Sequence, residues 1–498
     1  MPTSPAHERP AERVSDGEAR FEARRRAVGR IAAPLLLGLL LLFPPAALKP
    51  EAARLLALVA ATLVAWLTEA LPIPVTALLA PALGVALGVA PAKAMFAPMA
   101  DPILYLFVGA FFIAEAIERT GADRVVAERL FARASGHTGR VVLLACLCTA
   151  GLSTMLSNTA TTAMMLPIVR AALPGASAGV MGRVYLSIAF CASIGGIGTP
   201  VGTPPNLIGL GQLRSVAHIE VTFLEWCLVA APVMAILLAF WTLWVGRQSQ
   251  RIPGSAATSF PPVDPEARLG RVLTVAVFAL TAALWVTPGV IALVLGPTSK
   301  AYTTFTARLP EGTVALLGAS LLFVLPRGRG RDSSGGYRPI LTWSEAKGID
   351  WGTVLLFGGG LCLGEQAFAT GLSEWAGRGI VAATGVSTVL GLAWLFSVTA
   401  IVLTELTSNT ATAAMMCPLA VMASVEAGVS PVAPCIATAL GASMAFLLPI
   451  STGPNALVYG TGLVPIGLMA RHGLVLDVIA AAIIAPLVVA MVSLIGIG

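Results

Sequence analysis

The chain has 498 residues, of which 57% are hydrophobic and only 11% are charged, and its mean hydropathy is +0.86. Soluble domains carry about 25% charged residues, so this composition excludes a soluble globular protein. The net charge of +6 fits arginines in cytoplasmic loops, and we therefore expect no nucleic-acid partner.

Long apolar stretches predict an all-α polytopic membrane protein with about 11 transmembrane helices, because a backbone in lipid must satisfy its hydrogen bonds internally. The polar residues 1–30 are expected to form a cytoplasmic tail, followed by a first transmembrane helix at 31–50. Two spans at 53–90 and one at 103–118 come next. The arginine-rich, amphipathic stretch 119–140 is typical of a helix lying on the cytoplasmic surface.

Two polar interruptions follow in the first half. The region 141–170 carries Ser-Asn-Thr at 157–159 between apolar segments, and Ser153 lies on the same helical face as the start of this motif. Such groups are costly in lipid unless they bind a ligand or one another. The region 183–212 is interrupted by Gly-Thr-Pro-Pro-Asn at 202–206, which we expect to be irregular because its prolines lack N–H donors.

The same pattern returns in the second half. The region 383–420 carries Ser-Asn-Thr at 408–410, preceded by Thr404 at the spacing of Ser153 in the first copy. The region 433–463 is interrupted by a second proline–asparagine motif. Several motifs thus recur about 250 residues apart, which indicates an internal duplication.

We divide the chain into repeat 1 at 51–250, a cytoplasmic loop at 251–270 and repeat 2 at 271–498. The basic loops all fall on the cytoplasmic side only if 141–170 and 383–420 form re-entrant hairpins, which enter the membrane and return to the same side without crossing it. The amino terminus is then cytoplasmic, the carboxyl terminus is outside, and the repeats have inverted topology. Inverted repeats with broken helices are typical of secondary transporters.

The polar motifs indicate which ions bind there. A helix that begins at a Ser-Asn-Thr tip offers unpaired N–H groups and a positive dipole end to an anion. Free carbonyl oxygens at an opposed half-helix suit a small cation such as Na⁺. The carboxylates in or near spans are candidates for function, but several lie near span ends, so we interpret as structural or interfacial Glu69, Glu115, Glu225, Glu365, Glu405 and Asp477.

These motifs, together with Trp-Leu-Thr-Glu-Ala-Leu-Pro-Ile-Pro at 66–74, resemble the divalent anion/sodium symporter (DASS) family of carboxylate and sulfate transporters. The resemblance covers nearly the whole chain after the tail. It implies a homodimer in the lipid bilayer, in which each protomer has a fixed scaffold domain and a mobile, elevator-type transport domain containing both hairpins. It also implies two or more sodium ions, with one site per repeat.

By motif position, the resemblance also implies the residues of the site. The small anionic substrate would contact Ser157, Asn158, Thr159, Thr203, Ser408, Asn409, Thr410 and Thr452. Sodium would bind Ser153, Ser157, Asn158 and Gly202 in the first repeat, and Thr404, Thr407, Asn409 and Ser451 in the second. Gly453 stands where many relatives carry proline, which removes a rigid contact beside the substrate.

The expected function is sodium-coupled symport of a small divalent anion across the bacterial inner (plasma) membrane. The expected substrate is a C4-dicarboxylate such as succinate, malate or fumarate, or a related di- or tricarboxylate. Sulfate transport and sodium-independent dicarboxylate exchange are alternatives, and an anion channel fits paired hairpin tips less well. We expect no enzyme, because the four histidines lie in the tail, in loops or at span ends and leave Ser157 without a base.

Overall fold

The computed structural model describes residues 16–131, 138–173, 175–249, 268–328 and 338–497. Within these ranges all regular elements are helices, which confirms the predicted all-α class. The first half of the predicted tail and nearly all of the predicted loop at 251–270 lie outside the described residues.

The helices follow one another closely along the chain. The first half forms α1 (Asp16–Leu42), α2 (Pro50–Thr68), α3 (Ile73–Ala86), α4 (Ala92–Phe96), α5 (Pro102–Thr120), α6 (Ala122–Phe131), α7 (Thr138–Ser153), α8 (Asn158–Ala172), α9 (Ala178–Gly196), α10 (Pro204–Ala217) and α11 (Phe223–Ser249). The second half forms α12 (Arg268–Leu295), α13 (Lys300–Arg308), α14 (Glu311–Leu322), α15 (Trp343–Ala346), α16 (Trp351–Thr370), α17 (Leu372–Thr384), α18 (Val389–Thr404), α19 (Asn409–Glu426), α20 (Val432–Gly441), α21 (Gly453–Gly460) and α22 (Ile466–Ile495).

Several of these helices can cross a membrane. Within the described ranges, α2, α9, α11, α12 and α22 are long and apolar enough to do so. The successive helices α17 and α18 are bent by 92° relative to each other, which fits either a broken span or a re-entrant segment. The chain is therefore a multi-pass membrane protein, while the total of about 11 spans and the re-entrant course of the hairpins stay predictions.

The duplication recurs in the order and in the ends of the helices. α5 and α16 each begin after an aspartate whose carboxylate accepts a first-turn backbone hydrogen bond, at 2.9 Å for Asp101 and 3.1 Å for Asp350. Both helices end at a glycine in the left-handed region, Gly121 with φ +67° and Gly371 with φ +80°. The same local chemistry thus begins and ends the same element in both halves.

Three helices differ from the prediction. α1 begins at Asp16, so half of the predicted tail is helical and continues into the first span. α13 and α17 occupy stretches in which no helix was predicted. The duplication could have predicted α17, because its counterpart α6 lies within the amphipathic stretch about 250 residues earlier.

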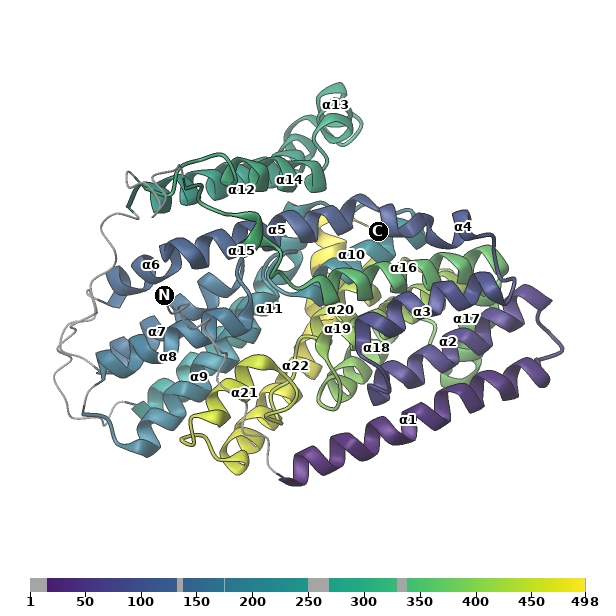
Figure 1. Cartoon of the computed structure of the whole chain (residues 1–498), viewed down its shortest axis with the longest axis horizontal. Helices are drawn as coiled ribbons and strands as arrows, with labels where there is room; N and C mark the ends of the chain where they lie inside the picture. The colour runs from purple at the N-terminus through teal and green to yellow at the C-terminus, as the bar shows by residue number, and fades with distance from the viewer. Residues whose placement is uncertain (1–15, 132–137, 174, 250–267, 329–337, 498) are drawn as a thin grey trace, which may run out of the picture.

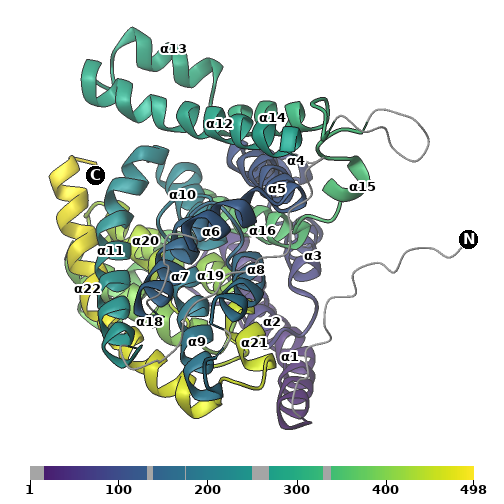
Figure 2. The ribbon, with the colours of Figure 1, turned by 90° about the vertical axis from the view of Figure 1, so that its left-hand side faces the viewer.

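The helices pack in layers around a buried interior. α12, α13 and α14 lie at one edge of the molecule, where α14 packs on α5, and α1 lies at the opposite edge along α2 (Figures 1 and 2). In the interior, the ring of Phe190 in α9 lies 5.0 Å from that of Trp241 in α11 and 4.9 Å from that of Phe446, which follows α20. These aromatic contacts join the two halves.

Small residues allow the closest helix crossings, as expected where lipid gives little hydrophobic drive for helices to associate. A Cβ on Gly195 of α9 would overlap the backbone of Ala150 in α7, and a Cβ on Gly359 of α16 would overlap that of Ala77 in α3. The first crossing places the end of α9 directly beside the end of α7.

Candidate functional site

The first polar tip lies where α7 ends and α8 begins. α7 ends at Ser153, and α8 starts at Asn158. The buried Ser153 hydroxyl donates across the turn to Oδ1 of Asn158 at 2.6 Å. Two residues predicted to bind the same sodium ion are therefore in direct contact.

The break between α9 and α10 packs against this tip. Nδ2 of Asn206 donates to the carbonyl oxygens of Gly196 at 3.0 Å and Thr199 at 2.7 Å. The Thr199 hydroxyl in turn donates to the carbonyl oxygen of Thr154 in the tip. Backbone oxygens from the break and from the tip therefore gather in one place.

Two glycines leave room for these oxygen atoms. A Cβ on Gly202 would lie 2.7 Å from the carbonyl oxygen of Thr154 and would overlap that of Gly196. A Cβ on Gly196 itself would lie 2.6 Å from Oδ1 of Asn158. The predicted ligand Gly202 thus lies among the oxygens of the first site, and a side chain there would displace them.

The proline motifs are more regular than predicted. The break ends at Thr203, and Pro204 and Pro205 form the first turn of α10. The expectation that 202–206 is irregular is therefore wrong for its second half, because the first turn of a helix needs no N–H donor and tolerates proline. In the second repeat the break is longer, spanning 442–452, and Pro454 likewise lies in the first turn of α21.

The second tip repeats the contact of the first. The buried Thr404 hydroxyl lies 2.7 Å from Oδ1 of Asn409 and 2.8 Å from the carbonyl oxygen of Ala442, where the second break begins. The hydroxyl of Thr407 lies 2.7 Å from that of Thr412 in α19. Thr404 and Asn409 therefore correspond to Ser153 and Asn158 in geometry as well as in sequence.

The second break is closed by Asn455 as the first is closed by Asn206. Nδ2 of Asn455 donates to the carbonyl oxygens of Ala445 at 3.0 Å and Leu448 at 3.1 Å. The sequence separations are 10 and 7 residues, the same as for Asn206. Ser451, a predicted ligand, lies 3.2 Å from the same amide nitrogen.

Each of these asparagines leaves one buried acceptor unused. Oδ1 of Asn206 and Oδ1 of Asn455 have no hydrogen-bond partner among the described residues. An unpaired buried acceptor costs about 1–3 kcal/mol, and a cation can satisfy it. Neither asparagine was assigned to the site from the sequence, although both belong to the proline–asparagine motifs. Thr199 was not assigned either, because no sequence motif marks it.

The helix N-termini at the tips are left open. The N-cap residues of α8, α19 and α10 are Ser157, Ser408 and Thr203, and none of these side chains caps its own helix. Thr452, at the start of α21, differs because its hydroxyl accepts from the backbone N of Asn455 at 3.3 Å. Open N–H groups and a positive dipole end suit a carboxylate or sulfate oxygen.

Burial separates the two predicted sets of residues. The exposed or partly exposed side chains belong to the predicted substrate set: Ser157, Asn158, Thr159, Ser408, Asn409, Thr410 and Thr452. The residues predicted only for sodium are buried: Ser153, Gly202, Thr404, Thr407 and Ser451. Thr203 is the exception, since it is predicted for the substrate but buried.

The two repeats meet at these elements. α8 of the first repeat packs on α21 of the second, and α10 of the first repeat packs on α19 of the second. A Cβ on Gly453 would overlap the side chain of Thr159, which places the start of α21 against the first tip. The structure thus joins the first tip to the second break directly.

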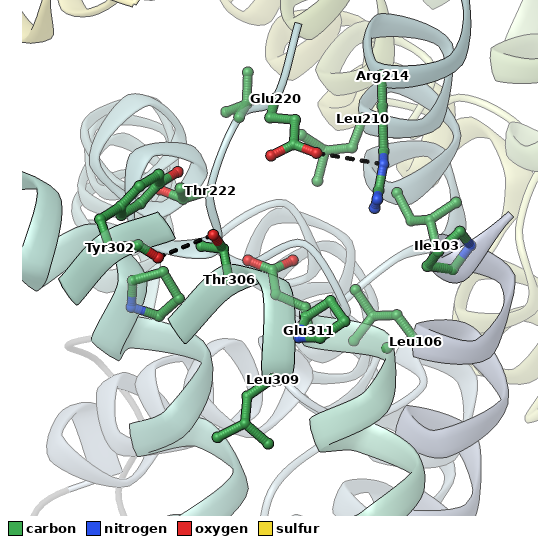
Figure 3. A pocket seen from close by; sticks show the side chains of 15 residues that line it. Ile103, Leu106, Leu210, Arg214, Glu220, Thr222, Tyr302, Thr306, Leu309 and Glu311 are labelled. Atoms are coloured by element: carbon green, nitrogen blue, oxygen red, sulfur yellow. Dashed lines mark hydrogen bonds and ion pairs between the residues drawn. The ribbon is translucent and has the colours of Figure 1, made fainter. Parts of the chain in front are cut away.

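A separate cavity of about 100 Å³ lies between α5, α10, α12, α13 and α14 (Figure 3). Arg214 and Glu220 face each other there at 3.7 Å, and Glu311 accepts a hydrogen bond from the backbone N of Phe223 at 2.9 Å. None of the predicted site residues lines this cavity. It is therefore distinct from the two tips.

A family model described as "Sodium:sulfate symporter transmembrane region" matches residues 25–497. The chain belongs to this family. It is therefore a membrane transporter and not an enzyme, as the sequence predicted.

Relatives within this symporter family cover most of the chain. The sodium-dependent dicarboxylate transporter SdcS of Staphylococcus saprophyticus is 32% identical over 470 residues, covering 90% of this chain and 87% of its own. SdcS of Staphylococcus aureus is 32% identical over 481 residues, covering 92% and 89%. An uncharacterised transporter of Haemophilus influenzae is 34% identical over 448 residues, covering 88% and 91%.

Two solved transporter structures share the fold. The YdaH transporter of Alcanivorax borkumensis aligns with a TM-score of 0.51 and 15% identity, covering 78% of this symporter-family chain and 85% of its own. MtrF of Neisseria gonorrhoeae aligns with a TM-score of 0.50 and 13% identity, covering 91% and 96%. At these identities the likeness concerns the helical arrangement alone.

Proposed function

We propose that the protein is a secondary active transporter of the bacterial plasma membrane that couples sodium to the uptake of a small divalent anion. The substrate class is the C4-dicarboxylates, such as succinate, malate and fumarate. The observation that carries the proposal is the pair of matched tips, each with open helix N–H groups next to buried oxygens. The sodium-dependent dicarboxylate transporters at 32% identity support the same substrate and ion.

One sodium ion binds in each repeat. The first is held by Ser153, Ser157, Asn158 and Gly202, and the second by Thr404, Thr407, Asn409 and Ser451. The buried, converging hydroxyl and amide oxygens of both repeats support this assignment. Hard oxygen ligands without thiolate or imidazole suit an alkali cation rather than a transition metal.

The substrate lies between the two tips. It contacts Ser157, Asn158, Thr159 and Thr203 from one repeat, and Ser408, Asn409, Thr410 and Thr452 from the other. Seven of these eight side chains are exposed or partly exposed, which supports the assignment. Neither Ser-Asn-Thr motif contains lysine or arginine, so helix dipoles and sodium must balance the anion's charge.

Charge explains why sodium is required. Each helix N-terminus contributes roughly half a positive charge, so two tips offset only about half of a dianion's charge. Sodium bound beside each tip more than balances the charge that remains, and it preforms the anion site. Sodium therefore binds first. The transport domain must not change sides when it is empty or holds sodium alone, and this restriction couples sodium flux to substrate flux.

Transport moves both tips together. The contacts of α8 with α21 and of α10 with α19 support one mobile body that contains both hairpins. This body moves as an elevator against a fixed scaffold in each protomer of a homodimer. The repeats are inverted, with the amino terminus cytoplasmic and the carboxyl terminus outside.

The proposal is tested on the purified full-length protein. Thermal unfolding is measured with succinate, citrate or sulfate, in sodium and in choline at equal ionic strength. We expect succinate to raise Tm in sodium only, because a ligand at about 100 times its Kd stabilises the folded state by about 2.7 kcal/mol. Ser157→Ala and Asn409→Ala should abolish the shift, whereas Ser320→Ala, an exposed serine in α14, should keep it.

Uptake into proteoliposomes separates the alternatives. Labelled succinate should accumulate only with an inward sodium gradient. Equal uptake in choline would contradict symport, and succinate counterflow without sodium would indicate exchange. Sulfate is the second candidate because the family model is named for it, and sodium-dependent stabilisation by sulfate but not succinate would favour it.

A further inference from the structure

Four arginines gather where α12 begins. The backbone N of Gly270, in the first turn of α12, donates to the carbonyl oxygen of Arg327 at 2.9 Å, and the backbone N of Arg327 donates to that of Arg338 at 3.0 Å. Arg268 lies two residues before Gly270, and Arg271 follows it directly. We call Arg268, Arg271, Arg327 and Arg338 the arginine cluster. It belongs to the edge of the molecule formed by α12 to α14 (Figure 2).

Polar contacts fix this cluster to the neighbouring helices. The Arg327 guanidinium donates to the carbonyl oxygen of Arg119, in the last turn of α5, at 2.7 Å. It also lies 3.3 Å from Oε1 of Glu345 in α15, and the Arg338 guanidinium lies 3.7 Å from the same oxygen. The other Glu345 oxygen accepts from the backbone N of Thr342 at 2.9 Å, as part of the capping box of α15. One carboxylate therefore serves two arginines and a helix cap.

Positive charge in the cluster exceeds the negative charge that reaches it. Among the described ion pairs, Glu345 is the carboxylate that contacts the cluster, which has four guanidinium groups. The charge of Arg119 is balanced by Glu115 of its own helix at 2.7 Å. Arg268 is exposed and forms no ion pair with a described residue, and the side chain of Arg338 is 52% exposed. This surface therefore offers guanidinium groups to an anion.

Exposed apolar side chains continue from the cluster along the adjoining helices. Val272 and Val275 of α12 and Leu321 and Val324 of α14 are all exposed, and the two helices pack on each other. Trp343 of α15 is 63% exposed. Tryptophan and arginine are typical of the boundary between the headgroups and the acyl chains of a membrane. A charged surface thus borders an apolar one, as the headgroup borders the acyl chains in a phospholipid.

We propose that the arginine cluster binds an anionic phospholipid. The phosphate group lies against Arg268, Arg327 and Arg338, and the acyl chains lie along the exposed side chains of α12 and α14. Guanidinium N–H groups pair well with phosphate oxygens, and basic pockets between membrane helices are typical of headgroup sites. A soluble anion would use the arginines but not the apolar side chains. The bound lipid joins the start of α12 to α5, α14 and α15.

Thermal unfolding of the purified full-length protein in detergent tests the proposal. Tm is measured against phosphatidylglycerol, against phosphatidylcholine with the same acyl chains, and against glycerol 3-phosphate. We expect a rise in Tm with phosphatidylglycerol alone, because it has both a net negative charge and acyl chains. A rise that phosphatidylcholine matches would overturn the charge recognition, and one that glycerol 3-phosphate matches would assign the surface to a soluble anion instead.

Two double variants locate the site. Arg268→Gln combined with Arg338→Gln should raise the phosphatidylglycerol concentration that gives half of the Tm shift at least about tenfold. Arg54→Gln combined with Arg378→Gln removes the same charge from exposed positions on α2 and α17, which pack together away from α12 (Figure 1), and should leave that concentration unchanged. Equal loss in both would mean that the lipid responds to net charge only, which contradicts a site. A change of oligomeric state in the first variant, without any lipid effect on wild type, would assign the surface to a second copy.

Trp343 gives an independent readout if the first double variant does not fold. Brominated acyl chains quench tryptophan fluorescence on contact, so brominated phosphatidylglycerol should quench the wild type more than brominated phosphatidylcholine does. This excess should be lost in Trp343→Phe and kept in Trp394→Phe, which alters a tryptophan of α18 that is 53% exposed. An excess that survives in Trp343→Phe would overturn the placement of the lipid.

Discussion

At the residue scale, hydroxyl and amide groups have two different tasks in the tips and breaks. Some bond within the protein, as Ser153 does with Asn158 and Thr404 with Asn409. Others, such as the open N-cap Ser157, remain available to a ligand. In lipid an unsatisfied polar group is costly, so the buried and unpaired Oδ1 atoms of Asn206 and Asn455 point to an ion.

Thr404 allows this to be tested with a matched pair of variants. Thr404→Val keeps the shape but removes the hydroxyl that joins Asn409 to Ala442, and the loss should raise the half-saturating sodium concentration about tenfold. Thr404→Ser keeps the hydroxyl and should stay close to wild type. Uptake is measured against sodium at saturating succinate. A Val variant as sodium-sensitive as the Ser variant would remove Thr404 from the site.

The resemblance placed Ser153 with Asn158, and Thr404 with Asn409, in one sodium site each, and the two members of each pair are in contact. The residues that close the breaks were not assigned. Ser153 and Asn158 lie five positions apart, and the tight turn between α7 and α8 brings them together. The hydrogen bonds of Asn206 and Asn455 reach carbonyls up to 10 residues earlier, at the last residue of α9 and within the irregular 442–452 break. No periodicity predicts the path of such a segment.

At the element scale, hydropathy located most helices, and local chemistry located their ends. The span predicted at 103–118 is found as α5, Pro102–Thr120. α13 was missed because it is short and polar, and α17 because its amphipathic pattern lacks a long apolar run. The proline motifs do mark breaks between helices. Because the first turn of a helix tolerates proline, the irregular segment lies before the prolines rather than at them.

Close packing of α9 on the first tip gives an element-scale prediction. In Gly196→Ala the new Cβ would lie 2.6 Å from Oδ1 of Asn158, so this side chain must shift from the position in which it accepts from Ser153. Overpacking of this kind costs about 1–3 kcal/mol, and sodium affinity should fall at least about tenfold. The measurement is the sodium dependence of succinate uptake.

Gly151→Ala is the matched control for this substitution. Gly151 lies in α7, and a Cβ there would meet nothing within 4 Å. Its sodium dependence should equal that of wild type. If Gly196→Ala behaves the same way, the first tip does not need the close approach of α9.

At the scale of the whole molecule, the second tip contacts α1 in this structure. Arg25 of α1 donates to the carbonyl oxygen of Leu406 at 2.8 Å and forms an ion pair with Glu69 at 2.8 Å. α1 packs along α2 and lies far from the edge formed by α12 to α14 (Figure 1). If the tips move while α1 stays with the scaffold, this contact must break in each cycle.

Cross-linking tests that motion. Arg25→Cys and Leu406→Cys, joined by a short cleavable linker in a background without the seven native cysteines, should abolish succinate uptake, and cleavage should restore it. The control pair Arg327→Cys and Glu345→Cys replaces an ion pair of 3.3 Å beside α14 and α15 and should leave uptake intact. Full uptake after complete cross-linking of the first pair would contradict relative motion of α1 and the tip.

The sequence by itself determined the membrane class, the duplication and the two Ser-Asn-Thr tips, because hydropathy, repeated motifs and helix-start chemistry are local properties of the chain. Tertiary structure decided which oxygens converge. The contact of Gly453 with Thr159 and the hydrogen bond of Thr404 to Ala442 join segments that are far apart in the sequence. A polar group's partner in lipid is set by which helix lies next to it, and local sequence does not contain that information.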